Sequence, residues 1–80
     1  MRIDKFLKIS RLIKRRTVAT EACNSGRITV NDKVAKASTT VKEGDIICIG
    51  FGEKQTKVRI LKIVDFIKAE EANTMFESVE

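Results

Sequence analysis

Basic side chains cluster between Arg11 and Arg16, where four of six residues are positively charged and a helix is expected to follow. Helix N-termini present unpaired N–H groups and a partial positive charge, which together favour phosphate. Arginine adds planar, two-pronged contacts to a phosphate or to the edge of a guanine. The cluster therefore predicts a phosphate-binding surface. A merely solvated basic face is the alternative, and the scarcity of nearby acidic partners argues against it.

The distribution of charge along the 80-residue chain also favours a polyanionic partner. The net charge is +5, but residues 1–42 carry eleven basic and three acidic side chains, a balance of +8. Residues 43–80 carry five basic and eight acidic side chains, a balance of −3. This asymmetry predicts one face that attracts a polyanion and another that repels it. A chain of this length is sufficient for one domain with a small core.

The residue types needed for catalysis or metal binding are scarce. The chain has no histidine, and neither Cys23 nor Cys48 has a nearby partner that would activate its thiol. Both cysteines stand among apolar residues, so we expect buried, unpaired thiols. The fragment Gly50-Phe51-Gly52 lacks the helix and the lysine of a phosphate loop. We therefore expect no catalytic residues, no metal site and no cofactor, and the lack of a signal-like or transmembrane stretch predicts a cytoplasmic protein without membrane contact.

The aromatic content bears on the kind of nucleic acid that would bind. Tryptophan and tyrosine are absent, and the phenylalanines mostly occupy positions typical of a core: Phe6, Phe51, Phe66 and Phe76. Proteins that bind single strands stack bases on exposed aromatic side chains. The sequence therefore favours structured RNA, recognised through its backbone and shape. Phe51 is the one candidate for exposure, although packing in the core or the loop is favoured.

Two helices are expected in the N-terminal half. Ile3, Phe6 and Leu7 follow the spacing of one buried helical face. A second helix is predicted from about residue 15 or 17 to residue 25, with Thr17 as a plausible N-cap. Its buried stripe consists of small residues that permit close packing: Val18, Ala19, Ala22 and Cys23.

The hydrophobic period changes from helical to alternating after Gly26, which is expected to end the second helix in a left-handed conformation. Strands are predicted over residues 27–30 and 33–34. Between them, Asn31 and Asp32 are expected to form a tight turn.

The second half of the sheet is expected to begin with a strand over residues 46–49, which looks buried on both faces. A polar loop is predicted over residues 50–56. The next strand starts at residue 57, and a bulge or bend at Leu61 would let it continue through Val64.

The C-terminal segment, residues 67–80, is acidic and contains apolar residues at helical spacing: Ala72, Met75, Phe76 and Val79. It predicts a short amphipathic helix or a tail that docks weakly. The whole chain is therefore expected to be an α+β protein, with two packed N-terminal helices followed by a small twisted antiparallel sheet. We expect residues 1–66 to form the RNA-binding domain, with its core motif over about 1–50, and residues 67–80 to form the acidic C-terminal helix or tail.

Several individually weak motifs combine into a specific pattern over about residues 1–50: Arg2-Ile3-Asp4-Lys5-Phe6-Leu7, Ser10-Arg11, Ala22, Gly26-Arg27-Ile28-Thr29-Val30-Asn31, Val34, Lys36-Ala37-Ser38, Val41 and Gly44-Asp45-Ile46. With this pattern the chain resembles the RNA-binding domain named after small-subunit ribosomal protein S-four. The resemblance implies the alpha-L RNA-binding motif, in which two packed helices precede a small antiparallel sheet. Asp32 stands where this family commonly has glycine, so the hairpin tip is expected to differ in shape.

Within this family the chain most resembles stand-alone bacterial proteins of ribosome-associated quality control, through the segments Arg11–Thr17 and Glu70–Asn73. The resemblance implies binding to large ribosomal subunits obstructed by peptidyl-tRNA, with contacts to large-subunit ribosomal RNA and to tRNA. It also implies that the protein, with the partner RqcH, supports alanine tailing of stalled chains. A related heat-shock protein has a longer basic tail, whereas this chain ends in an acidic one. Away from the ribosome we expect a monomer.

The residues expected to bind RNA are the basic ones of the N-terminal half: Arg2, Lys5, Lys8, Arg11, Lys14, Arg15, Arg16, Arg27, Lys33 and Lys36. Asp4 is expected to orient Arg2 or Arg16, or alternatively to stabilise the dipole of the first helix. Two other functions remain open. One is a ribosome-assembly or subunit-stabilising protein that also binds empty subunits, and the other is an accessory RNA-binding subunit of an RNA-modifying enzyme.

Overall fold

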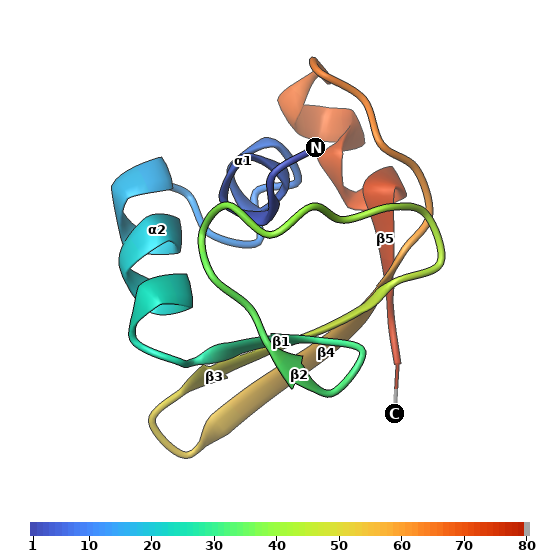
Figure 1. Ribbon diagram of the computed structural model, residues 1–80. Helices are drawn as coiled ribbons and strands as arrows, with labels where there is room; N and C mark the ends of the chain where they lie inside the picture. Colours follow the sequence, from blue (N-terminus) through green and yellow to red (C-terminus); the bar gives the residue numbers. More distant parts are fainter. Residues whose placement is uncertain (80) are drawn as a thin grey trace.

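The computed structural model describes residues 1–79. Its helices and strands follow in chain order: α1 Ile3–Ile9, α2 Arg16–Asn24, β1 Ile28–Val30, β2 Lys33–Val34, β3 Ile46–Phe51, β4 Lys54–Ile60, the 3-10 helix η1 Ala69–Met75 and β5 Phe76–Ser78. The strands form one antiparallel sheet in the order β2-β1-β3-β4-β5. Figure 1 shows α1 and α2 side by side over the same face of this sheet. The expected α+β class is confirmed.

Helix α1 packs the predicted apolar face into the core. Ile3, Phe6 and Leu7 are fully buried, which confirms the face expected from their spacing. The chain then turns through Arg11, whose backbone is left-handed with a φ of 63°. Beyond this turn Ile13 returns to the core, so both ends of the connection between the helices are fixed.

Helix α2 begins two residues earlier than a Thr17 N-cap requires. The N-cap position is Arg15, which has extended backbone angles, and no side chain caps the helix there. Thr17 already lies within the first helical turn, so its prediction as the N-cap is wrong. An N-cap residue needs non-helical backbone angles, and Thr17 does not have them.

The small-residue stripe of α2 was predicted to be buried, and only part of it is. Ala19, Ala22 and Cys23 are buried against the core, whereas Val18 is 38% exposed. Val18 therefore lies outside the packed face, at the edge of a cleft. Gly26 ends the helical segment with a φ of 79°, as expected for a left-handed stop.

The β1–β2 hairpin has the predicted turn. Asn31 and Asp32 both have positive φ, 51° and 69°, as a two-residue turn of the primed type requires. The Asn31 side chain also accepts a hydrogen bond from the N–H of Ile46 at 2.9 Å and donates one to Asp45 at 3.1 Å. These bonds attach the hairpin to the start of β3.

The β3–β4 hairpin differs from the sequence prediction in three ways. Ile47 and Ile49 are buried, but the alternate side chains of β3 are only partly buried, because helices cover one face of the sheet alone. The polar loop expected over residues 50–56 is largely strand, since cross-strand pairing continues to the Phe51–Lys54 pair. Strand β4 ends at Ile60 and does not continue through Val64.

The C-terminal segment is incorporated into the fold by a short helix followed by a strand. Met75 is fully buried at the end of the 3-10 helix. Phe76 then begins β5, which pairs with β4, and the N–H of Val79 donates to the carbonyl of Lys57 at 2.9 Å. The predicted short C-terminal helix is therefore present as η1, with Ala72 and Met75 buried, but it ends at Met75 and does not reach Val79. The alternative of a weakly docked tail is wrong. The apolar residues at helical spacing therefore belong to two successive elements, η1 and β5, and both elements contact the core.

Two further burial predictions are corrected by the structure. Phe66 is 83% exposed because it lies in the irregular segment between β4 and η1. Cys48 is only partly buried because it points to the uncovered face of the sheet, whereas Cys23 is buried as expected, and both thiols are free. Within residues 1–79, none of the helices is both long enough and apolar enough to cross a lipid bilayer.

Replacing Met75 by alanine is expected to lower the free energy of unfolding by roughly 2–5 kcal/mol, because it removes a fully buried side chain that joins η1 to the core. Urea denaturation measures this loss. The control is Val34→Ala, an exposed site where a change within about 0.5 kcal/mol is expected. Equal stability of the two variants would contradict the docking of the C-terminal segment.

Candidate nucleic-acid interface

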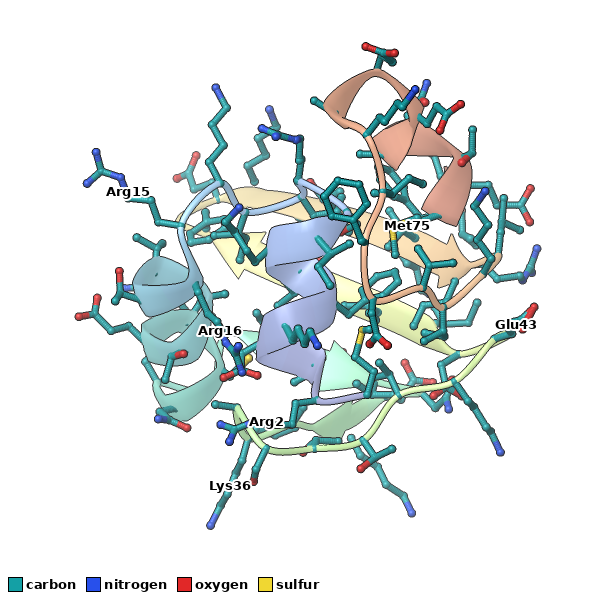
Figure 2. The ribbon with its side chains drawn as sticks, turned by 90° about the horizontal axis from the view of Figure 1, so that it is seen from above. Arg2, Arg15, Arg16, Lys36, Glu43 and Met75 are labelled. Carbon is teal, nitrogen blue, oxygen red and sulfur yellow. The ribbon has the colours of Figure 1, made fainter. Side chains whose placement is uncertain are left out.

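The carboxylate of Asp4 brings together two arginines that lie far apart in the sequence. Asp4 is on α1 and only 2% exposed. Arg2 donates to it from two nitrogens, Nε to Oδ1 at 3.2 Å and Nη2 to Oδ2 at 3.1 Å. Arg16, at the start of α2, donates from Nη2 to Oδ1 at 3.4 Å. Figure 2 shows the two guanidinium groups on the same side of the molecule, facing one another.

The remaining acceptor capacity of Asp4 is also used. The backbone N–H of Lys5 donates to Oδ1 at 2.8 Å, and the Thr20 hydroxyl lies 3.2 Å from Oδ2. Thr20 sits one helical turn after Arg16, so α2 contributes two contacts to the same carboxylate. Thr20 was not among the predicted site residues, although its spacing of four from Arg16 is the signal that could have identified it. Among residues 1–79, no buried side-chain nitrogen or oxygen lacks a hydrogen-bond partner.

The electrostatics of this cluster keep Asp4 ionised. Burial raises the pKa of the Asp4 carboxyl, but the Arg2 hydrogen bond, the charges of Arg16 and Arg2 and the Lys5 N–H together outweigh burial. The pKa therefore lies below its ordinary value of 3.8. The side chains of Arg2 and Arg16 remain 53% and 47% exposed, so their outer N–H groups are available to a ligand. This geometry favours an orienting role for Asp4, which also lies in the first turn of α1, where a negative charge stabilises the helix dipole.

Lys36 and Arg15 also belong to the predicted RNA-binding set, but they lie differently with respect to Arg2 and Arg16. The N–H of Asp4 donates to the carbonyl of Ala37 at 3.4 Å, so the turn that carries Lys36 lies beside the start of α1. Figure 2 shows Lys36 on the same side as Arg2 and Arg16, whereas Arg15 points outward from the start of α2.

The remaining predicted residues are dispersed. Lys5 pairs with Asp65 at 3.4 Å, a contact that sequence reasoning missed because sixty residues separate the two. Lys8 and Arg11 line a shallow hollow near Phe66. The other members of the predicted set lie apart from the pair: Lys14 follows the α1 turn, Arg27 lies beyond the far end of α2, and Lys33 is on β2.

Neither the arginine cluster nor the buried thiol suggests covalent chemistry. Burial and the neighbouring Asp4 charge raise the pKa of the Cys23 thiol to about 11. A thiol with so high a pKa is protonated near neutral pH and is a poor nucleophile. Within residues 1–79, no group of three histidine, cysteine or acidic side chains is arranged to hold a metal ion. The arrangement is suited to holding an anion by charge and hydrogen bonding.

Comparison with known proteins assigns the chain to a family. Residues 1–47 match the family model described as the S4 domain. The chain is 58% identical over 77 residues to a Halalkalibacterium halodurans protein named RQC P-site tRNA stabilizing factor, covering 96% of this chain and 88% of that protein. A Bacillus subtilis protein of the same name is 51% identical over 76 residues, covering 95% and 88%. The chain belongs to this family of S4-domain proteins.

A solved structure agrees with this family assignment. The Vibrio cholerae Heat Shock Protein 15, described as trimeric, matches this structure with a TM-score of 0.90 at 30% identity. The match covers 99% of this chain and 81% of that protein. The expected likeness to S-four-type domains, and more distantly to the heat-shock protein, is confirmed.

The Asp4→Asn variant is expected to be less stable than the parent at neutral pH, by roughly 1.5–3 kcal/mol, because the charged hydrogen bonds are lost. The pKa of Asp4 is lowered in the folded state. Its contribution to stability is therefore fully present above pH 3.8 and is lost as the pH falls through the folded-state pKa. The free energies of unfolding of the two proteins, measured with denaturant from neutral to acidic pH, should become equal in acid. A difference in stability that stays constant across this range would count against the assignment.

Proposed function

We propose that this protein binds large ribosomal subunits that still carry a peptidyl-tRNA and stabilises the tRNA in the P site during ribosome-associated quality control. The observation that carries the proposal is the Arg2–Asp4–Arg16 cluster, in a chain that is 58% identical to a protein named for this activity. The cluster offers two oriented guanidinium groups on one side of a small basic domain. Guanidinium groups bind phosphate through paired N–H donors.

The proposed ligands are large-subunit ribosomal RNA and the tRNA. Arg2 precedes α1 and Arg16 begins α2, so the two side chains approach the ligand from different helices while sharing one carboxylate. One arginine is free to contact ribosomal RNA while the other contacts tRNA. Lys36 and the remaining basic residues of the N-terminal half add charge that attracts phosphate over a longer range.

The mechanism we infer is positional. A protein without reacting groups promotes a reaction cycle by binding one tRNA position more tightly than its competitors, and a preference of about 1.4 kcal/mol changes the populations tenfold. By holding the tRNA, the protein would support RqcH-dependent addition of alanine to the stalled chain. In this proposal residues 1–66 bind RNA as a cytoplasmic monomer, and the acidic residues Glu70, Glu71 and Glu77 face away from the RNA.

The Arg16→Ala variant is expected to bind obstructed large subunits more weakly by roughly 1–3 kcal/mol, as for one lost charged contact. Its fold should persist, because Arg2 still pairs with Asp4. Arg2→Ala should lose support for alanine tailing, with a smaller loss of affinity if it mainly positions the tRNA. Co-sedimentation, alanine-tail synthesis and thermal melting measure these effects.

Lys62→Ala is the matched control, since it also removes one exposed positive charge but lies beyond the end of β4. Normal tailing by folded Arg2→Ala and Arg16→Ala proteins would contradict the proposed site. Equal binding of the parent protein to empty and obstructed subunits would favour the subunit-stabilising alternative. An accessory role in RNA modification would be favoured by co-purification with a modifying enzyme in place of the large subunit.

Affinity for the large subunit should depend strongly on salt. If four to six phosphates are contacted, the logarithm of the association constant should fall with the logarithm of salt concentration at a slope of roughly −3 to −5. Binding titrations at several salt concentrations give this slope. An affinity independent of salt would remove the phosphate-binding account.

A further inference from the structure

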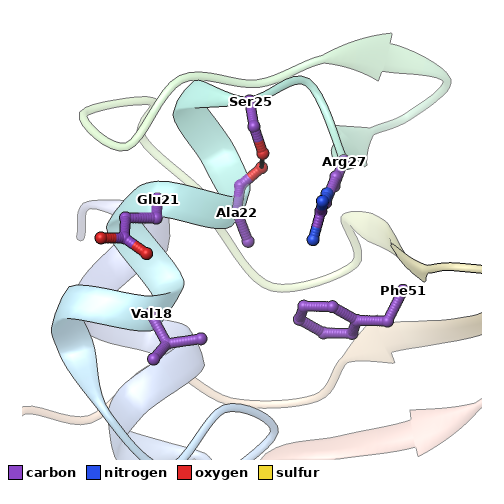
Figure 3. Close-up of a pocket in the computed structure, with 6 residues that line it drawn as sticks. All are labelled: Val18, Glu21, Ala22, Ser25, Arg27 and Phe51. Carbon is purple, nitrogen blue, oxygen red and sulfur yellow. Dashed lines mark hydrogen bonds between the residues drawn. The ribbon is translucent and has the colours of Figure 1, made fainter.

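A second surface feature lies along α2, where the helix faces the end of β3 and the residue before β1. Figure 3 shows a cleft between α2 and the segments that end β3 and precede β1. The volume of this cleft is about 210 Å³. Six residues line it: Val18, Glu21, Ala22, Ser25, Arg27 and Phe51. A cleft of this size is below the range of roughly 300–1,000 Å³ that accommodates drug-sized ligands. Its volume is suited to one small planar group.

Phe51 and Val18 form two apolar walls of the cleft, and both side chains are partly exposed to solvent. Phe51 is 40% exposed, and its ring extends toward α2 (Figure 3). Val18 is 38% exposed and faces the ring from the helix side. Aromatic rings that remain open beside basic residues are the surfaces on which RNA-binding proteins stack unpaired bases.

Arg27 supplies polar recognition at the mouth of the cleft. Its backbone is fixed on both sides, since its N–H donates to Ala22 at 3.1 Å and its carbonyl accepts from Gly50 at 2.9 Å. In the described part of the chain its side chain takes part in none of the ion pairs or side-chain hydrogen bonds. Figure 3 shows the guanidinium group directed toward the ring of Phe51, while the Glu21 carboxylate points away.

We propose that this cleft binds one unpaired base of RNA, stacked on Phe51 and hydrogen-bonded to Arg27. The inference rests on the proposed function, because it assumes an RNA ligand. The guanidinium group has donors only, so it matches a base edge that presents two acceptors. Guanine presents O6 and N7 on one edge, whereas adenine presents N7 beside a donating amino group. The site is therefore expected to prefer guanine to adenine.

The cleft adjoins the arginine cluster along α2. Glu21 lines both this cleft and the hollow formed with Arg2, Asp4 and Arg16. Helix α2 has nine residues, a length of about 13.5 Å at 1.5 Å per residue. One strand of RNA held at its backbone by the arginines can thus place a nearby base in the cleft. The protein would then read one base in addition to binding phosphate.

Titration of the isotope-labelled protein with guanosine 5′-monophosphate, followed by NMR, tests the cleft without a ribosome. The nucleotide should shift the ring signals of Phe51 and the Nε–H signal of Arg27. Adenosine 5′-monophosphate should bind more weakly, and ribose 5-phosphate, which lacks a base, should leave the ring signals unchanged. The proposal is overturned if guanosine 5′-monophosphate moves neither set of signals or if ribose 5-phosphate reproduces its effect.

Two variants separate stacking from structural packing. Phe51→Leu keeps an apolar contact with α2 but removes the aromatic face, so it should lose the nucleotide-induced shift at Arg27 while keeping its melting temperature. Arg27→Lys keeps the charge but loses the planar pair of donors, so it should lose the preference for guanine. Phe66→Ala is the matched control, an exposed phenylalanine outside the cleft. Unchanged nucleotide binding by Phe51→Leu would contradict the proposal.

Binding to large subunits distinguishes this inference from the proposed function. Phe51→Ala should weaken binding roughly 5- to 150-fold, as expected for the loss of one stacked base. If the parent protein binds obstructed subunits but no nucleotide, the base-binding proposal is overturned and the proposed function is not. A parent protein that binds the nucleotide in the cleft but no subunits supports the cleft and overturns the proposed function. Lys62→Ala should leave the nucleotide titration unchanged, because Lys62 is exposed and lies outside the cleft.

Discussion

The buried carboxylate of Asp4 is the constraint on which the binding surface depends. An ionised carboxylate that is removed from water costs several kcal/mol unless opposite charges and hydrogen bonds compensate it. Arg2, Arg16, the Lys5 N–H and the Thr20 hydroxyl supply this compensation. Arg2 and the Lys5 N–H belong to the start of α1, whereas Arg16 and Thr20 belong to α2. The same set of contacts therefore joins the two helices and fixes the directions of two arginines. Structure and recognition therefore share one set of hydrogen bonds.

The rest of the fold holds that cluster in place and leaves surfaces around it accessible. The sheet supports both helices through a core in which Ile47 and Val58 are fully buried, and η1 closes the core through Met75. The two N-terminal helices pack on one face of the sheet. Along the chain, charge is divided between residues 1–42, with a balance of +8, and residues 43–80, with a balance of −3. Such a division favours an oriented encounter with RNA, since one side attracts phosphate and the other repels it.

The sequence was sufficient for features governed by local chemistry. The buried face of α1, the left-handed Gly26 and the Asn31-Asp32 turn follow from spacing and backbone preference, and the structure agrees. Features that depend on distant contacts were missed. Strand β5 exists because β4 offers an unpaired edge, and the Thr20–Asp4 contact exists because two helices pack together. A local sequence pattern shows neither the free edge of β4 nor the packing of α1 against α2. In addition, apolar residues at helical spacing can belong to a short helix followed by a strand.

Asp4 is proposed to serve binding by orienting Arg2 and Arg16, although its own negative charge is unfavourable to RNA. The most direct test is the affinity of folded Asp4→Asn for obstructed large subunits at neutral pH, compared with that of the parent protein. This substitution raises the net charge from +5 to +6, obtained by removing one negative charge from the parent value. If orientation governs recognition, the variant binds more weakly in spite of its greater positive charge. Equal or tighter binding would mean that charge alone attracts the RNA, and it would contradict this account.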